Sequence, residues 1–265
     1  MPLKANKGNY KGIACLTQHS RAEIISWLSK ADVLYNDITT SAVGFVLTTD
    51  ASRAGWGAVT KDNKTGGSWT PVESELNINA LELKAVQFGL KSLCKSKPNV
   101  HIHLRTYNVT AVTYINNMGG TKSRICNLIA NEIRTWSINW NIWLSAEHLP
   151  GSKNVVADEQ SPVFDDTTEW IINKCVFLEL VKIFGSLAID LFASQLAKQV
   201  TTFVSWKPDP GVLFIGAFSR PWHELNLYAF PPFSVVGRCI NKKKQEKAQG
   251  MIILPLWHGF QLHSI

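Results

Sequence analysis

The order of β-rich and helical stretches between Ala42 and Ser161 constrains the folding of this 265-residue chain more than any other feature. Three short runs rich in β-branched and aromatic residues come first, divided by turn residues: AVGFVLT, GWGAVT and GGSWT. NALELKAVQFGLKSL then repeats apolar residues at three- and four-residue spacing, which predicts a helix. A strand, two helices, a strand and a final helix complete the predicted succession, which favours a mixed sheet flanked by helices.

The second half of this region carries its own start and stop signals. HIHLRTY predicts a strand, and Asn108 directly after it is a suitable cap for a helix through VTAVTYINNM. Gly119 and Gly120 should break that helix. SRICNLIANEIRTWSI then predicts a longer amphipathic helix, and NIWLSAEHL predicts a strand.

The chain divides into three predicted segments, 1–40, 41–163 and 164–265. In the first, Ser20 is a candidate helix cap, and the apolar face predicted for that helix carries Ile24, Ile25, Trp27 and Leu28. In the third, SLAIDLFASQL, the bend AFPPF and the buried-strand pattern GMIILPLW predict a further, smaller α/β unit.

Composition indicates a globular protein, with 45% hydrophobic and 18% charged residues. The net charge of +7 favours a polyanionic partner such as nucleic acid or an acidic membrane surface, although ordinary surface lysines also explain it. Five scattered cysteines without a CxxC spacing fit neither a disulfide framework nor a zinc site. No apolar run is long enough to span a bilayer. We therefore expect an intracellular protein without a membrane partner, in the nucleus or the cytoplasm.

Three acidic residues are candidates for a metal site. Asp50 ends a predicted strand, Glu82 lies on the helix INALELKAV, and Asp158 in GSKNVVAD comes near the start of the last predicted helix. A mixed sheet with this succession can gather them on one face, where their oxygens would bind the hard divalent cations used in phosphodiester hydrolysis. Each also has a simpler explanation: Asp50 as a turn former, Glu82 as a solvated helix residue and Asp158 as a helix cap.

Several long motifs resemble the ribonuclease H region of DIRS-like, tyrosine-recombinase-type retrotransposon polyproteins: TDASRAGWGAV, WTPVESELNINALELKAV, NVTAVTYINNMGGTKS, NIWLSAEHLPGSKNVVAD and TEWIINKCVF. The resemblance implies a ribonuclease H-like mixed five-stranded sheet in 41–163. It also implies that 1–40 is the thumb or connection remnant of a reverse transcriptase. Neither a YxDD polymerase motif nor the Arg-His-Arg-Tyr set of a recombinase occurs, so we expect a fragment or a domesticated remnant.

The resemblance places the family's catalytic acids and Mg²⁺ ligands on Asp50, Glu82 and Asp158. The family's further acid, which precedes an Asn after the fourth strand, falls on Tyr107. A phenol is neutral at pH 7 and cannot replace a carboxylate that bridges two Mg²⁺ ions. We therefore expect hydrolysis to be weak or absent unless another ligand, such as Glu159, supplies the missing charge.

The family's substrate is an RNA–DNA hybrid, which is recognised by shape through 2′-hydroxyls and phosphates. His148, before Pro150-Gly151, resembles the mobile histidine loop that aids product release, although a lone histidine is also a common structural group. The candidate substrate-binding residues are small or basic, and such residues are also common at helix ends: Asn108, Asn116, Thr121, Lys122, Ser123 and Arg124.

The third segment resembles, more faintly, phage-type DNA adenine methyltransferases through IDLFAS, FVSWKPDPG, YAFPPFSVV and GMIILPLW. In those enzymes an Asn or Asp before Pro-Pro-aromatic accepts hydrogen bonds from the target base. Here Phe230 precedes Pro231, Pro232 and Phe233, so the motif is degenerate and we expect no methyl transfer from S-adenosylmethionine. The alternative is a Pro-Pro-Phe loop that closes a hydrophobic core.

Three functions are compatible with these residues. The first is a Mg²⁺-dependent, ribonuclease H-type endonuclease that cleaves the RNA strand of a hybrid. The second is an impaired remnant that binds nucleic acid without cleaving it, which Tyr107 favours. The third is a scaffold that does not bind hybrid at moderate salt.

Overall fold

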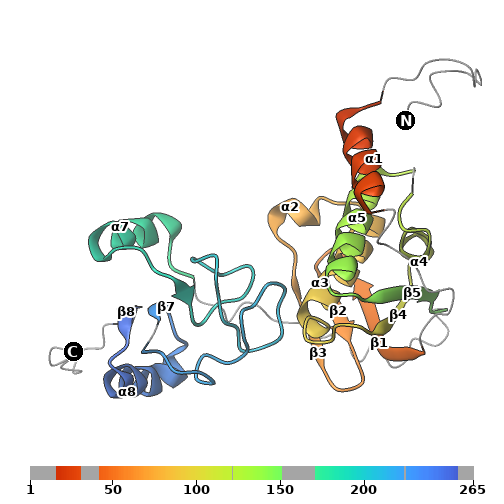
Figure 1. Ribbon diagram of the computed structural model, residues 1–265. Coiled ribbons are helices and arrows are strands. Elements are labelled where there is room, and N and C mark those ends of the chain that lie inside the picture. The colour runs from red at the N-terminus through yellow and green to blue at the C-terminus, as the bar shows by residue number, and fades with distance from the viewer. Residues whose placement is uncertain (1–15, 31–41, 121, 151–170, 224, 256–265) are drawn as a thin grey trace, which may run out of the picture. The chain divides into compact units, whose positions relative to one another are not determined.

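The computed structural model describes residues 16–30, 42–120, 122–150, 171–223 and 225–255 (Figure 1). The chain forms two compact units, Met1–Ser41 and Ala42–Ile265. Within the described residues, no helix is both long and apolar enough to cross a bilayer.

The first unit contains helix α1 (Gln18–Lys30). The Thr17 side chain caps it, because Thr17 Oγ1 accepts a hydrogen bond from the Ser20 amide at 3.1 Å. The prediction that Ser20 is the cap was therefore wrong, since the helix begins earlier and Ser20 already lies in its first turn. The side chains of Ile24, Ile25, Trp27 and Leu28 are all exposed.

The second unit contains a mixed five-stranded sheet in the order β3-β2-β1-β4-β5 (Figure 1). β1 pairs antiparallel with β2, β2 pairs antiparallel with β3, and β1, β4 and β5 run parallel. The strands are β1 (Val43–Ala51), β2 (Gly55–Val59), β3 (Lys64–Ser68), β4 (His101–Thr106) and β5 (Trp143–His148).

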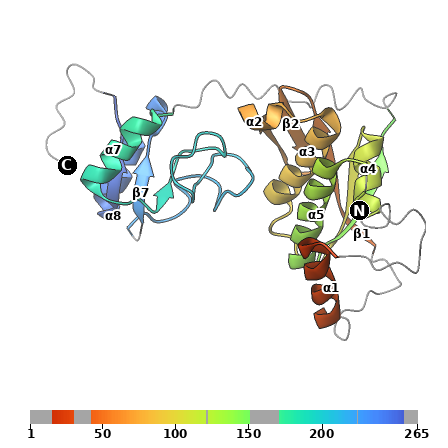
Figure 2. The same cartoon turned by 90° about the horizontal axis from the view of Figure 1, so that it is seen from above.

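Among the described residues, four helices accompany this sheet. Asn77, Asn108 and Ser123 cap the three longer ones through their side-chain oxygens. The longest two, α3 and α5, lie side by side (Figure 2). Buried side chains of both helices pack with Leu47, Ile102 and Leu104 of the sheet into one core. The helices are α2 (Pro71–Ser74), α3 (Ile78–Leu93), α4 (Val109–Asn116) and α5 (Arg124–Asn139).

This arrangement confirms the predicted ribonuclease H-like mixed five-stranded sheet with flanking helices. Only the short helix α2 was not predicted. Its signal is the capping box of Thr70 and Glu73 around Pro71. The predicted final helix, which contains Asp158, lies outside the described residues.

The side chain of Ser52 stabilises the turn after Asp50. Ser52 Oγ accepts hydrogen bonds from the amides of Ala54 and Gly55, each at 3.2 Å. Gly55 is required for a different reason, because a Cβ there would lie 2.5 Å from the Gly67 carbonyl oxygen on the neighbouring strand. The glycine therefore permits close strand approach at the start of β2.

The rest of the second unit contains a three-stranded parallel sheet in the order β6-β7-β8. Its core includes the fully buried Trp222, Leu227 and Cys239. A parallel sheet with helices is present here, within the same compact unit as the five-stranded sheet. In the described part of GMIILPLW, β8 is an edge strand and Gly250 in it is exposed, so this strand is not buried throughout. The elements are α7 (Lys174–Phe184), β6 (Ile189–Asp190), β7 (Asn226–Ala229), the 3₁₀ helix η3 (Phe233–Val235), α8 (Val236–Glu246) and β8 (Gln249–Ile252).

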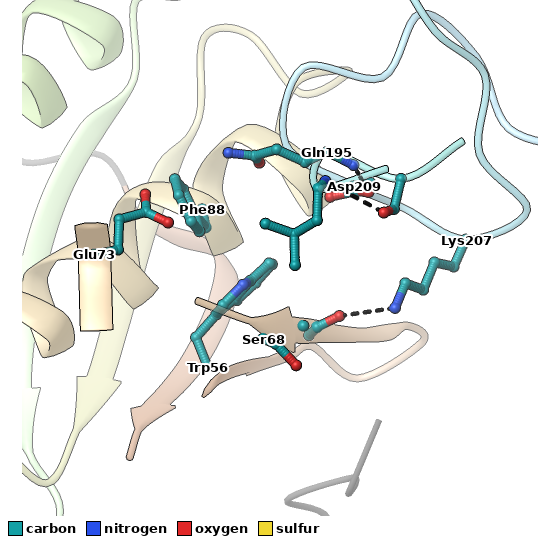
Figure 3. A pocket seen from close by; sticks show the side chains of 11 residues that line it. Trp56, Ser68, Glu73, Phe88, Gln195, Lys207 and Asp209 are labelled. Atoms are coloured by element: carbon teal, nitrogen blue, oxygen red, sulfur yellow. Dashed lines mark hydrogen bonds between the residues drawn. The ribbon is translucent and has the colours of Figure 1, made fainter. Parts of the chain in front are cut away.

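Residues Lys207–Asp209 contact strand β3. The buried Lys207 Nζ donates to the Gly66 carbonyl at 3.1 Å, and Thr65 Oγ1 donates to the Pro208 carbonyl. The side chains of Trp56, Phe88, Gln195 and Asp209 border a cavity of about 20 Å³ beside these bonds (Figure 3). A cavity of this size holds about one water molecule, so it is a packing gap and not a ligand site.

Candidate active site

The candidate site lies where the parallel strands β1 and β4 end. Thr49 of β1 is in register with Thr106 of β4, so the next residues, Asp50 and Tyr107, follow at adjacent strand ends. A carboxylate at residue 107 would thus lie beside the first predicted metal ligand. The structure shows that Tyr107 directly follows β4 and is next in register to Asp50.

Glu82 reaches this point from helix α3, whose N-terminus is fixed by the Asn77 cap. The Glu82 residue is only 5% exposed, and its Oε2 accepts a hydrogen bond from Thr106 Oγ1 at 3.2 Å. Burial, and next the negative charge of Asp50, raise the pKa of Glu82 to about 7, while the Thr106 hydrogen bond opposes this rise. Two of the three predicted acids therefore converge, and Asp158 lies outside the described residues.

The oxygen donors present here fit one Mg²⁺ ion better than two. Mg²⁺ keeps several waters and commonly takes one or two protein carboxylates together with substrate phosphate oxygens. Asp50 and Glu82 supply such a pair, and the repulsion that raises the Glu82 pKa is what a cation would relieve. Among the described residues, no group of three or more His, Cys, Asp or Glu side chains could hold a metal ion.

His148 is on a strand and not in a loop. It is the last residue of β5, in register with Thr106, and its Nε2 donates to the Tyr107 carbonyl oxygen at 3.1 Å. Strand pairing therefore extends to His148, residues 151–170 lie outside the described residues, and the predicted role of this histidine in product release stays a prediction. The histidine nevertheless lies next to the candidate site through its contact with Tyr107.

Asn108 joins two helices beside the acids. Its Oδ1 accepts from the Ala111 amide at 2.8 Å, and its Nδ2 donates to Asn79 Oδ1 at 2.8 Å. Asn79 lies one turn before Glu82 on α3, so this pair ties the start of α4 to the helix that carries the acid. Asn79 was not among the predicted site residues, although its three-residue spacing from Glu82 was a usable signal.

The side chain of Asn116 forms hydrogen bonds with the backbone of β5. Its Nδ2 donates to the Ala146 carbonyl at 2.9 Å, and its Oδ1 accepts from the Ala146 amide at 2.8 Å. The amide thus bonds the backbone of an edge strand as a neighbouring strand would. These bonds give Asn116 a structural role. Its side chain is exposed and keeps one N–H and one oxygen lone pair, so the predicted substrate contact stays a prediction.

The residues around the start of α5 include one with a structural role and two exposed cations. Ser123 caps α5 through its Oγ, and its amide donates to the Tyr114 hydroxyl at 2.9 Å. Lys122 and Arg124 on either side of it are exposed. These two cations are the accessible members of the predicted set, whereas Thr121 lies outside the described residues.

The degenerate methyltransferase motif follows strand β7. Pro231 is buried, Phe230 is partly buried, and Pro232 and Phe233 are exposed. No polar side chain occupies the position that would accept hydrogen bonds from a target base, because that residue is Phe230. The buried Pro231 and the turn into η3 agree with the alternative of a loop that closes the adjoining core.

No protein-family model and no curated protein matches the sequence. Among solved structures, the complex of LC11-RNase H1, isolated from compost by a metagenomic approach, with an RNA/DNA hybrid is 19% identical and has a TM-score of 0.38, over 43% of this chain and 91% of that chain. RNase H1 from the halophilic archaeon Halobacterium salinarum NRC-1 is 19% identical with a TM-score of 0.35, over 43% and 92%.

A third similar structure is the protease-reverse transcriptase of prototype foamy virus. It is 15% identical, with a TM-score of 0.28, over 56% of this chain and 21% of that chain. The assignment of the fold does not depend on these scores. The strand order and directions alone give the five-stranded sheet and its helices a ribonuclease H-like fold.

Proposed function

We propose that this chain is a retroelement-derived, ribonuclease H-like protein that binds RNA–DNA hybrids and hydrolyses the RNA strand weakly or not at all. One observation carries the proposal: Asp50 and the buried Glu82 converge at the strand ends, where Tyr107 replaces the next acid. Origin from a DIRS-like element rests on the resemblance of the sequence motifs. On that resemblance, 1–40 is a reverse transcriptase remnant, 41–163 the ribonuclease H-like domain and 164–265 a degenerate adenine-methyltransferase-like module.

In this proposal Asp50 and Glu82 hold one Mg²⁺ ion, with Asp158 as a further ligand. When bound, the ion would polarise a phosphate oxygen and lower the pKa of a coordinated water. Thr106 orients the Glu82 carboxylate through its hydroxyl, and the Asn79–Asn108 pair fixes α4 beside it. Tyr107 adds no negative charge, so a second cation would find one carboxylate fewer here and the cleavage step would lose stabilisation.

A nucleic-acid partner is supported by the net charge of +7 and by the exposed Lys122 and Arg124 near α4. The LC11-RNase H1 structure is itself a complex with an RNA/DNA hybrid. The second candidate function is that of a non-catalytic binding or scaffold remnant, which Tyr107 favours. Methyl transfer from S-adenosylmethionine is not part of either proposal, because Phe230 supplies no acceptor.

Binding can be tested by fluorescence anisotropy with a labelled RNA–DNA hybrid over a series of salt concentrations. We expect log K to fall linearly with log salt concentration, because phosphate contacts release counterions. Lys122→Ala with Arg124→Ala should weaken binding about tenfold and reduce the salt slope by roughly 1–2. The charge-matched control, Lys61→Ala with Arg134→Ala, removes two exposed cations elsewhere and should change little.

Absence of hybrid binding at moderate salt would contradict the proposal and support the scaffold alternative. Equal losses in the two double variants would mean that binding depends on overall charge and not on this surface. Thermal unfolding of each variant shows whether a loss of binding comes from a loss of folding.

A further inference from the structure

The three-stranded parallel sheet has a hollow along one edge. The hollow measures about 540 Å³ and is lined by β8 and Leu254 after it, by Phe184 at the end of α7, by Asn226 at the start of β7 and by one side of α8. Figure 1 shows these elements. This volume is within the range of ordinary ligand sites, about 300–1,000 Å³. It is separate from the acids at the ends of β1 and β4, because none of its lining residues belongs to the five-stranded sheet.

The backbone of β8 presents hydrogen-bonding groups to this hollow. In a parallel pair, alternate residues bond the same neighbouring strand. The Ile253 amide donates to the Ala229 carbonyl at 2.9 Å, so the N–H and C=O of Ile252 point to the opposite side. Since β8 is last in the order β6-β7-β8, no described strand pairs with that side.

The sequence of β8 lacks the usual protection of an edge strand. Natural edge strands commonly carry a lysine, a proline or an inward charge that blocks further pairing. Gln249–Leu254 contains none of these, and the first proline is Pro255. Parallel sheets are also normally buried, so an open and uncharged parallel edge is a favourable place for another strand to add.

The walls of the hollow define the side chains that an added strand would carry. Apolar contact comes from Phe184, which is 66% exposed, and from Ile240 and Met251. Lys243 is the charged residue of the lining, and no carboxylate lies among the lining residues. On α8 its neighbour Lys242 pairs with Glu246, and Lys244 is exposed nearby. The hollow therefore favours apolar side chains next to acidic ones.

We propose that the edge of β8 binds an extended polypeptide segment that adds a strand to this sheet and carries apolar and acidic side chains at alternate positions. The backbone bonds to Ile252 would supply affinity, and the apolar wall and Lys243 would supply selectivity. The strand period of two directs successive side chains to opposite faces, so a segment with this alternation can present one kind of side chain on each face of the added strand. The site is independent of the proposed hybrid binding.

The test uses a fluorescein-labelled eight-residue peptide of alternating valine and glutamate with the full chain, followed by anisotropy. We expect saturable binding. Ile252→Pro should weaken it at least tenfold, because proline removes the outward N–H while leaving the bonds of Ile253 to β7 intact. Ile252→Val keeps that N–H and should bind as the native protein does. Lys243→Glu should weaken binding about fivefold or more, whereas Lys182→Glu on α7 should not.

Three results would overturn the proposal. One is the absence of saturable binding by the native chain. Another is equal affinity of the native protein, Ile252→Pro and Lys243→Glu, with folding verified by thermal unfolding. The third is equal affinity for a valine–lysine peptide, which shows that charge plays no part. In the second case, competition with dodecanoate identifies the ligand class. If dodecanoate displaces the peptide and neither Ile252→Pro nor Lys243→Glu changes the affinity for dodecanoate, the hollow is a small-molecule site.

Discussion

At the scale of single residues, Glu82 shows how the fold alters an ordinary carboxyl group. Burial removes water from it, and the charge of Asp50 opposes its ionisation. The pKa of Glu82 in the folded protein is about 7, compared with an ordinary value of 4.5. The folded state therefore binds this proton more tightly than the unfolded state does, and the site carries an electrostatic cost at neutral pH in the absence of a cation.

The electrostatic cost of ionised Glu82 predicts how the stability of the fold depends on pH. Because the folded pKa is raised, the stability contributed by Glu82 is complete below about pH 4.5 and is lost as the pH rises through about 7. Glu82→Gln should remove that loss, and we expect it to be more stable than the native protein by about 1–3 kcal/mol at pH 8 but not at pH 4.5. Urea unfolding between pH 4.5 and 8 in EDTA measures the difference.

The matched control for this prediction is Glu75→Gln, which neutralises an exposed carboxylate shortly before α3. It should leave the pH dependence unchanged. Adding Mg²⁺ should stabilise the native protein at pH 8 more than it stabilises Glu82→Gln, because the cation favours the ionised carboxylate. A parallel pH dependence in the native protein and Glu82→Gln would show that Glu82 is not the titrating group.

At the scale of elements, the contact between α4 and β5 depends on one amide. Asn116 makes both of its bonds to the backbone of Ala146, and α4 begins at Asn108 beside the candidate site. The side chain thus fixes the distal end of α4 against the edge strand. It also blocks the backbone groups of that edge from pairing with another chain.

Replacement of this amide should therefore affect stability more than binding. We expect Asn116→Ala to lower the free energy of unfolding by about 1–2 kcal/mol, through the loss of two hydrogen bonds, and to speed hydrogen exchange at the Ala146 amide. Hybrid affinity should change less than twofold. Asn117→Ala removes the same group one residue later and is the control. A large loss of hybrid affinity without a change in the free energy of unfolding would support the predicted substrate contact of Asn116.

The sequence predicted the Asn108 cap correctly, because capping depends on a side chain and amides only two or three residues away. The Asn108 side-chain oxygen accepts from the Ala111 amide within the first turn. The role of Asn116 was not predictable in the same way, because Ala146 lies 30 residues further along the chain. Ser20 was assigned one turn late, since Thr17 offered an equally suitable hydroxyl.

At the scale of the whole molecule, the order of strands and helices was sufficient to predict the five-stranded sheet. That order limits which strands can pair, and a crossover helix between parallel strands restricts the topology further. The contact of Lys207 with Gly66 and the open edge of β8 were not predictable, because both depend on how distant segments pack. Convergence of Asp50 and Glu82 was predicted, whereas the raised pKa of Glu82 was not, because it depends mainly on burial in the fold.

Silencing of a ribonuclease H-like site by Tyr107 can be tested directly by one cleavage assay. A labelled RNA–DNA hybrid and Mg²⁺ are incubated with the native protein, with Tyr107→Asp, and with Tyr107→Asp carrying Asp50→Asn as the background. Restoring about 4 kcal/mol of stabilisation should raise the rate about a thousandfold. We predict cleavage above background by Tyr107→Asp alone. Cleavage by the native protein at a rate similar to that of Tyr107→Asp would contradict the claim.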